Sequence, residues 1–280
     1  IMRQLKFRLD RKSLEIIYTS FIRPLLEYAD VIWGNATKSE LDELDKIQNE
    51  CARIASGATR LVSIEKLSNE INWEPLEERR YIHRMVLFYK IQNGQTPDYL
   101  SSIIPQTTNN RYNLRNTDDI PGIYARTTLY YNSFFPTAIR EWNNLPSEVR
   151  TLPSLPSFKH HFKKNKRKTP NYFYSGERKL QILHTRLRTK CSSLNYHLFL
   201  KNIKDSPLCL CGQVENNFHY FFECIHYTTA RQKLLRKLAN IDIDIELNIL
   251  LNGNPVLSDQ INTMIFAHVH NYIYNTKRFT

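Results

Sequence analysis

The feature that most constrains this chain is a compact group of metal-ligating residue types in its last third. The segment Cys209-Leu210-Cys211-Gly212 is followed by His219 and Cys224, so three thiols and one imidazole fall within one short stretch. This is the ligand set of a tetrahedral structural zinc site. Gly212 allows the chain to bend back directly after the second thiol. The pattern is typical of a zinc knuckle and predicts one zinc ion held by Cys209, Cys211, His219 and Cys224.

The spacing of the first two thiols departs from the commonest pattern, because a single residue separates Cys209 from Cys211 where two or more are usual. The alternative is a set of buried, unliganded cysteines beside a core histidine. Cys191 and His226 are spare ligands that rank below the main four. Aromatic side chains that can shield the metal flank His219 in the sequence, namely Phe218, Tyr220, Phe221 and Phe222.

Length and charge suggest the broad class. The 280 residues correspond to about two domains, and 41% hydrophobic content with 12% aromatic residues is enough for buried cores. A formal charge of +12 and a pI near 9.4 indicate a polyanionic partner, because Lys and Arg attract phosphate backbones by releasing condensed counterions. The alternative is a soluble protein that is simply basic.

The sequence has neither an apolar run long enough to span a membrane nor a secretory signal. We therefore expect an intracellular, reducing setting and no membrane partner. Five cysteines, an odd number with three at one site, favour a metal over a disulfide framework. Because the first residue is Ile1 rather than Met, we expect a piece of a longer polypeptide.

Helical periodicity dominates residues 1–95, which are predicted to form a helical bundle. Apolar residues recur at helical spacing over 13–32, where Pro24 removes a backbone donor and predicts a bent helix near Phe21. Capping and stop residues predict three further helices: from Ser39 to Gly57, from Ser63, and from Pro75 to Gly94. Cys51 falls on the apolar stripe of the first of these and is predicted to be a core thiol.

Residues 96–170 are predicted to be a proline-rich connector, because eight prolines interrupt any long element. Ile139 and Trp142 are expected to pack together in a short helix, with the aromatics anchoring onto a core rather than stacking on bases. The connector closes with a basic run that contains no acid, and nucleic acid is the expected partner of such a run. Its cationic residues are Lys159, Lys163, Lys164, Lys166, Arg167 and Lys168.

Residues 171–280 are predicted to be a basic zinc-knuckle domain with carboxy-terminal helices. A basic helical segment leads into the knuckle, and its residues Arg178, Arg186, Arg188 and Lys190 are candidate phosphate contacts. A helix with exposed cations follows Cys224, and the final helix is expected to start at Ser258.

Polymerase or nuclease chemistry needs carboxylates that converge on metal ions. Asp30 stands alone at the end of a helical stripe, and the Asp118-Asp119 pair lies in a polar loop without flanking strands. No glycine-rich loop is present to hold a nucleotide phosphate. A nuclease built from Asp242, Asp244, Glu246 and Asp259 is the alternative, although the first three are also explained as a solvated loop.

Three segments carry a family resemblance, in this order. The stretch Phe21-Ile22-Arg23-Pro24-Leu25-Leu26-Glu27-Tyr28-Ala29-Asp30-Val31-Ile32-Trp33, the 133–145 segment with Trp142-Asn143-Asn144-Leu145-Pro146, and the Cys-x-Cys-Gly…His-x4-Cys knuckle resemble the carboxy-terminal third of non-LTR retrotransposon reverse transcriptases of the LINE and jockey-like type. The resemblance implies a mainly α fold with a helical thumb, a connector and a zinc knuckle, placed after the polymerase palm.

The same resemblance implies a function. The whole protein of such an element is an RNA-directed DNA polymerase that copies element RNA at a nicked chromosomal target, with magnesium held only in the upstream catalytic region. The family's Ala-Asp-Asp turn has no match in these residues, so no catalytic residue is assigned. We expect this part to grip RNA and DNA for the upstream palm domain, in the nucleus at the integration site. The alternatives are a metal-dependent target-nicking endonuclease and a domesticated zinc-dependent binding module.

Overall fold

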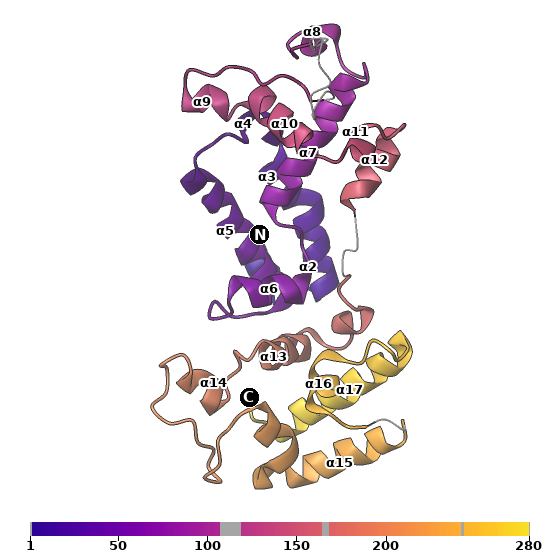
Figure 1. Ribbon diagram of the computed structural model, residues 1–280. Coiled ribbons are helices and arrows are strands. Elements are labelled where there is room, and N and C mark those ends of the chain that lie inside the picture. The colour runs from indigo at the N-terminus through magenta and orange to yellow at the C-terminus, as the bar shows by residue number, and fades with distance from the viewer. Residues whose placement is uncertain (1, 107–118, 164–167, 242–243, 280) are drawn as a thin grey trace. The chain divides into compact units, whose positions relative to one another are not determined.

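The computed structural model describes residues 2–106, 119–163, 168–241 and 244–279 (Figure 1). Within these residues every regular element is a helix, and one isolated antiparallel bridge joins Leu208 to Val214. The prediction of a mainly α fold is therefore confirmed.

The chain divides into two compact units, and neither is continuous in sequence. Unit 1 comprises residues 1–22, 47–73 and 168–280, and unit 2 comprises 23–46 and 74–167. The range 1–95, predicted as one bundle, contributes helices to both units. The range 171–280, predicted as the zinc-knuckle domain, lies wholly in unit 1.

Unit 1 is built around the carboxy-terminal helix α17 (Asp259–Thr276), whose N-cap is Ser258 as predicted. Helix α15 (Thr228–Ala239) lies along α17 in Figure 1, and α13 (Arg178–Arg188) and α16 (Leu247–Asn252) also pack on it. Its residues Ile265, Val269, Tyr272 and Ile273 are buried. The other elements of this unit are α1 (Met2–Leu5), α2 (Arg11–Ile17), η1 (Tyr18–Ile22), α6 (Ile64–Ile71), η2 (Asn171–Tyr174), α14 (Asn195–Phe199), η3 (His219–Glu223) and η4 (Ile225–Tyr227), with the end of α5 (Lys38–Ser56).

A buried ion network ties three helices of unit 1 together. The Arg11 guanidinium, 1% exposed, donates to Glu70 Oε1 at 2.6 Å, and Arg188 Nε donates to Glu70 Oε2 at 2.8 Å. Burial opposes the charge of Glu70, but the two guanidinium groups outweigh it and lower the pKa of this carboxyl. These buried ion pairs join helices α2, α6 and α13, and removal of one partner would leave the others as uncompensated buried charges.

The helix expected to bend at Pro24 is interrupted by a π-helical turn. The α-helix α2 passes into η1 and continues as α3 (Arg23–Glu27). Pro24 cannot donate a backbone hydrogen bond and its ring crowds the carbonyl four residues earlier, so a wider turn at this point relieves the clash. The predicted bend is thus a local widening of the helix.

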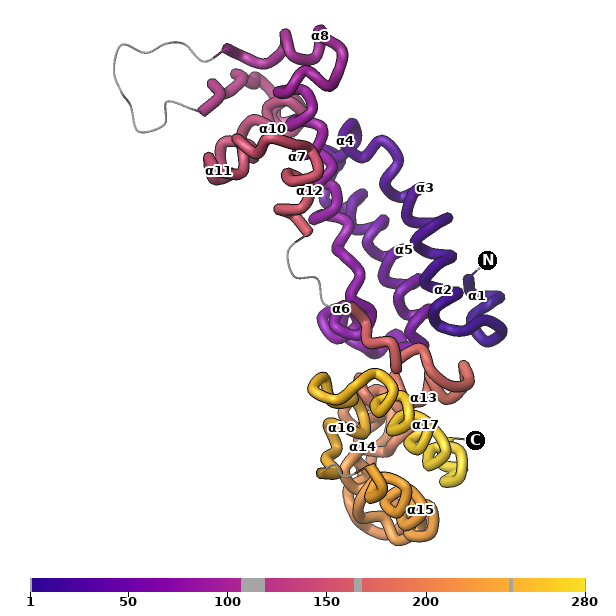
Figure 2. Tube along the Cα trace, turned by 90° about the vertical axis from the view of Figure 1, so that its right-hand side faces the viewer, coloured from indigo at the N-terminus to yellow at the C-terminus, as the bar shows by residue number. Residues whose placement is uncertain are grey.

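Unit 2 is organised around α7 (Leu76–Gln92), against which α10 (Phe134–Asn143) and α12 (Leu155–Phe162) pack; Figure 2 shows all three close together. Ile139 and Trp142 of α10 are buried as predicted, and Trp142 meets Phe88 with ring centroids 5.3 Å apart. Arg84 on α7 makes a bidentate ion pair with Glu141 on α10. The remaining helices are α3, α4 (Asp30–Trp33), α8 (Asp98–Ser101), α9 (Thr128–Tyr131) and α11 (Ser147–Arg150), with the beginning of α5.

The prolines of the range 96–170 begin helices more often than they interrupt them. Pro97 and Pro146 precede α8 and α11 as N-cap residues, and Pro156 lies in the first turn of α12. Proline fits these positions because the first helical N–H groups have no partner within the helix. The stretch expected to be a connector therefore supplies part of the core of unit 2.

One predicted cap is wrong. The helix expected to begin at Ser39 is α5, which begins at Lys38, and Thr37 and Glu40 hydrogen-bond each other's side chain and backbone in a capping box. Glu40 lies three residues after Thr37, the spacing that this motif requires, whereas Ser39 has Asp42 at that distance. The predicted stop at Gly57 and the buried Cys51 are confirmed.

Candidate metal centre

Cys209 and Cys211 lie on a tight turn that backbone hydrogen bonds close from both sides. Cys209 N–H donates to Gln213 O at 2.8 Å, and Gly212 N–H donates to Cys209 O at 2.9 Å. Gly212 has a φ of +89°, a left-handed conformation that glycine adopts without strain. The turn therefore presents both thiols from one short loop, as the sequence predicted.

His219 is the first residue of the single-turn π helix η3, and Cys224 follows that helix directly as its C-cap. Asn216 Oδ1 accepts the His219 backbone N–H at 2.8 Å, and Cys224 N–H donates to His219 O at 2.9 Å. These contacts fix the start and the end of the turn, so both ligands project from one rigid element. His219 is 2% exposed and Cys224 is fully buried.

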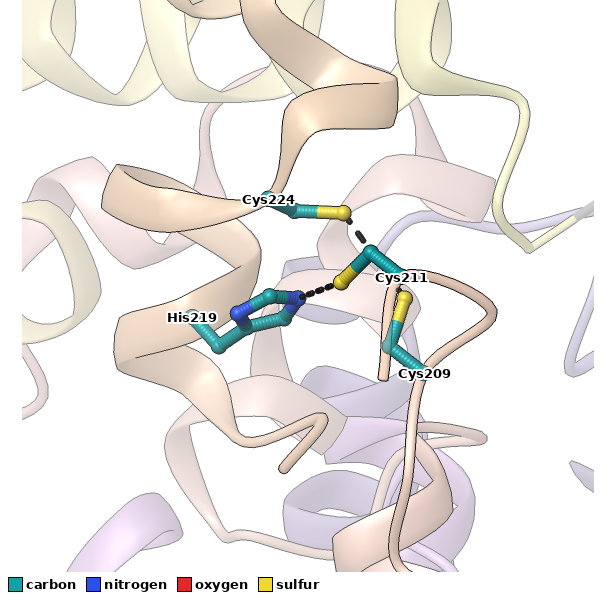
Figure 3. A group of neighbouring side chains, drawn as sticks. All are labelled: Cys209, Cys211, His219 and Cys224. Carbon is teal, nitrogen blue, oxygen red and sulfur yellow. Dashed lines mark hydrogen bonds between the residues drawn. The ribbon is translucent and has the colours of Figure 1, made fainter. Parts of the chain in front are cut away.

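The four side chains point toward one another in Figure 3. Cys209 Sγ and Cys224 Sγ are 3.7 Å apart, and Cys211 Sγ lies 3.2 Å from His219 Nε2. All four ligand atoms lie within 4.8 Å of one another. Tetrahedral coordination with Zn–S bonds of about 2.3 Å separates two sulfurs by about 3.8 Å. The cluster can hold a metal ion, and its dimensions are compatible with zinc.

The second nitrogen of His219 supports the same arrangement. His219 Nδ1 is buried without a hydrogen-bond partner among the described residues, and Glu223 Oε2 is 3.5 Å away. A histidine that binds metal through Nε2 commonly directs its Nδ1–H to a carboxylate, which fixes the tautomer and strengthens the ligand. Glu223 is the carboxylate positioned to take that role.

The thiols differ in their surroundings. The Gln213 backbone N–H lowers the pKa of Cys211, whereas burial raises the pKa of Cys224 to about 12. In the absence of a cation, these three sulfurs cannot all become thiolates so close together. A bound divalent ion supplies the missing positive charge and releases the protons.

Two of the flanking aromatics belong to the core of unit 1, and their shielding of a metal stays a prediction. Tyr220 and Phe221 are fully buried in the core of unit 1, where both rings contact Tyr272 of α17. The Tyr272 hydroxyl also donates to the Tyr220 carbonyl. Phe218 is half exposed. These side chains anchor η3, and with it two of the four ligands, to the longest helix of the unit.

The predicted spare ligands do not join the group. Among the described residues only Cys209, Cys211, His219 and Cys224 bring ligand atoms together in this way, so Cys191 and His226 remain outside it.

The candidate phosphate contacts are dispersed. Lys159 and Lys163 are exposed in unit 2, and Lys168 and Lys190 are exposed in unit 1. Lys164, Lys166 and Arg167 lie outside the described residues.

The three arginines of α13 have contacts within the fold. Arg188 is paired with Glu70, and its guanidinium lies 3.8 Å from the Phe173 ring centroid. Arg178 donates to three backbone carbonyls, and Arg186 Nε donates to Gly57 O at 3.2 Å. Phosphate contact by these residues stays a prediction, and Arg188 is the least available of the three.

The helix with exposed cations that was predicted after Cys224 is α15, although it was not among the candidate phosphate contacts. Lys233, Arg236 and Lys237 are exposed and, with His268 of α17, line a cavity of about 320 Å³. The spacing of the three cations at i, i+3 and i+4 places them on one helix face. Their alignment with His268 requires the tertiary structure.

The isolated carboxylates have other partners. Asp30 Oδ2 lies 2.6 Å from His83 Nδ1, Asp119 pairs with Arg150 at 2.9 Å, and Asp259 accepts from Asn171. Asp118 and Asp242 lie outside the described residues. In the part of the chain that the structure covers, no carboxylate belongs to a potential metal-binding group.

None of the described helices combines the length and apolar character needed to cross a membrane. No family model, curated protein or solved structure matches the chain.

Proposed function

We propose that this chain is the nucleic-acid-binding, zinc-stabilised carboxy-terminal part of a non-LTR retrotransposon reverse transcriptase, acting in the nucleus at the site of integration. The convergence of Cys209, Cys211, His219 and Cys224 on one point carries the proposal. The net charge of +12 supports a polyanionic partner. The retrotransposon assignment rests on the resemblance of the three sequence segments.

Zinc is the metal that suits these ligands best. Three thiolates and one imidazole are soft donors that favour zinc over magnesium or calcium, which prefer oxygen. Four protein ligands complete a tetrahedral shell, so no position remains for a reacting water. The ion is therefore structural in this proposal, and the chain grips nucleic acid without chemistry of its own.

A short connection joins the proposed metal centre to the basic face of α15. Cys224 is followed at once by η4 and α15, and Arg231 of α15 donates to the Cys224 carbonyl at 2.9 Å. Leu234 and Leu238 on the inner face are buried against α17. A bound ion thus fixes the first turn of the helix whose outer face carries the cations.

In this proposal Lys233, Arg236 and Lys237 contact phosphates of the template-primer, element RNA or target DNA. Such contacts supply affinity and position the protein on the backbone without reading sequence. The exposed Lys159, Lys163, Lys168 and Lys190 add to the same electrostatic attraction.

Fluorescence anisotropy with a labelled DNA duplex and a labelled RNA strand, titrated at several salt concentrations, tests this function. The logarithm of affinity should fall with the logarithm of salt, by about 0.9 per phosphate neutralised on duplex DNA and about 0.7 on single strands. The triple variant K233Q/R236Q/K237Q should flatten the slope on both ligands.

The variant K12Q/K38Q/K46Q removes the same charge from other helices and is the matched control. Affinity that does not change with salt, or equal losses in the two triple variants, would exclude a phosphate interface on α15.

A further inference from the structure

Unit 1 contains a second basic site, away from α15 in the sequence. A cavity of about 350 Å³ is lined by α1, the end of α5, the turn after it, and α13. Its lining includes one carboxylate, Glu50, and six cationic side chains: Arg3, Lys6, Arg53, Arg60, Arg178 and Arg186. The volume is within the range of small-ligand pockets.

Some of this charge has a structural explanation. Glu50 lies 3.1 Å from Arg3 and 3.7 Å from Arg60, so one carboxylate is shared by two guanidinium groups. Arg178 donates to the carbonyls of Ile54 and Ala55 at 2.6 and 2.8 Å. These carbonyls lie in the last turn of α5, where they have no hydrogen-bond partner within the helix. Stabilisation of the helix terminus accounts for Arg178, but not for the other cations.

Arg186 is the clearest unexplained charge. Its Nε donates to Gly57 O, while its two terminal nitrogens have no hydrogen-bond partner among the described residues. Burial lowers the pKa of Arg186, and no carboxylate offsets that effect. Arg53 Nε is also buried and has no hydrogen-bond partner in the described part of the chain, while its Nη2 donates to Val62 O at 3.5 Å. A partly buried guanidinium without an acid is costly to the fold unless an anion binds beside it.

An exposed aromatic ring stands beside these cations. Phe7 lines the same cavity and is 68% exposed, and Lys6 Nζ lies 4.6 Å from its ring centroid. A flat aromatic surface next to unpaired guanidinium groups suits a ligand that joins a planar base to a phosphate.

We propose that this cavity binds the phosphate of a nucleotide, with Arg186, Arg53 and Arg60 around the phosphate and Phe7 against the base. The phosphate is inferred from Arg186 and Arg53, which have no carboxylate partner among the described residues, and from Arg60, which shares Glu50 with Arg3. The choice of a nucleotide over another phosphorylated molecule rests on the proposed function and on Phe7. A free mononucleotide and the phosphorylated end of a strand share this chemistry.

Calorimetric titration of the 280-residue chain with adenosine monophosphate, adenosine and inorganic phosphate tests the free nucleotide. The monophosphate should bind well above adenosine, and Phe7→Ala should reduce its affinity toward that of inorganic phosphate. Arg186→Gln removes a charge-assisted contact and should weaken binding by about tenfold or more. Arg60→Gln should weaken binding without endangering the fold, because its side chain is 78% exposed. Lys12→Gln is the charge-matched control.

A second arm compares short strands that end in a 5′-phosphate or a 5′-hydroxyl. A preference for the phosphate that is lost in Arg60→Gln assigns the site to a strand end. Absence of any phosphate preference in both arms, or affinities that Arg186→Gln and Arg60→Gln leave unchanged, would overturn the site.

This result can be separated from the proposed function. The variant K233Q/R236Q/K237Q should leave mononucleotide binding intact, and Arg186→Gln should leave the salt dependence of duplex binding intact. Failure of one site therefore does not imply failure of the other.

Discussion

Each ligand of the candidate metal centre is positioned by a backbone contact near it in the sequence. Local sequence therefore predicts this part of the site. Gly212 permits the turn that presents two thiols, and the five-residue spacing of His219 and Cys224 suits one helical turn. Glu223, whose carboxylate lies 3.5 Å from His219 Nδ1, is also local, because it follows His219 by four residues.

Cys211→Ser should abolish stable metal binding, because a hydroxyl is a poor ligand for the soft ion that the other thiols select. A structural zinc can contribute about 10 kcal/mol or more to the folding of its site. Elemental analysis of purified protein should find about one zinc per chain in the parent and much less in the variant. Limited proteolysis should show new cleavage within 205–225.

The control is Cys51→Ser, which alters a buried thiol in another part of unit 1 and should retain the metal. A Cys211→Ser protein that keeps both zinc and protease resistance would show that the ligand set is wrong.

Two buried histidines make the stability of unit 1 depend on pH. His184 Nε2 is 3.0 Å from Leu250 O, and its Nδ1 is 3.2 Å from His270 Nε2, which fits two neutral rings in series. Burial, with Arg188 nearby, lowers the pKa of His270 to about 4 and lowers that of His184. The unfolded chain, with ordinary histidine pKa values, therefore binds more protons than the folded chain between about pH 4 and 6.5.

The free energy of unfolding should keep its full value above pH 6.5. It should decrease as the pH falls toward 4. His270 alone accounts for about 3 kcal/mol over that window. Urea denaturation at pH 4.5 and 7.5 measures the difference, and His270→Gln should reduce it. Equal pH dependence in the parent and in this variant would rule out His270 as the cause.

At the scale of elements, helix ends were predictable and helix partners were not. The starts at Ser63 and Ser258 and the stop at Gly57 depend on residues adjacent in sequence, so capping rules recover them. Arg188 shows the limit of such rules. Its charge suggests a solvent or phosphate contact, but its partner Glu70 is 118 residues away. No local pattern identifies that pair.

Glu70→Gln should destabilise unit 1 by about 3–5 kcal/mol, because it leaves Arg11 and Arg188 buried without their shared counter-charge. Chemical denaturation followed by circular dichroism measures the loss. Glu65→Gln removes the same charge from the exposed face of the same helix and should change stability by less than about 0.5 kcal/mol. Similar effects from the two changes would mean that the buried pairs contribute little.

At the scale of the whole molecule, composition predicts a polyanionic partner, and two carboxylates that stand out in the sequence have partners within the fold. Asp30 and Asp119 have His83 and Arg150 as partners and do not converge. The noncontiguous units were beyond sequence reasoning, because the prolines of 96–170 look like linker residues until their positions at helix starts are seen.

Primer extension on an RNA template should give no product with this chain alone, since metal-assisted nucleotidyl transfer needs converging carboxylates. The proposed function predicts that product forms when a reverse-transcriptase palm segment is joined upstream of these residues. Cys211→Ser in that longer protein should impair priming on element RNA more than extension of a generic annealed primer. Extension by the 280 residues alone, abolished by Asp119→Ala, would place the catalytic centre here and overturn the family inference.

The division of unit 1 among residues 1–22, 47–73 and 168–280 has a consequence for synthesis on the ribosome. Helices α2 and α6 are synthesised early, but Glu70 gains its second guanidinium only after α13 has been synthesised. By contrast, all segments of unit 2 have been synthesised once the chain reaches residue 167. Domains fold as units when their chain is complete, so unit 2 can form first. A fragment of residues 171–280 would contain the metal ligands, but Arg188 would lack its partner Glu70. For studies of the metal centre, the polypeptide should therefore be expressed with its amino-terminal helices.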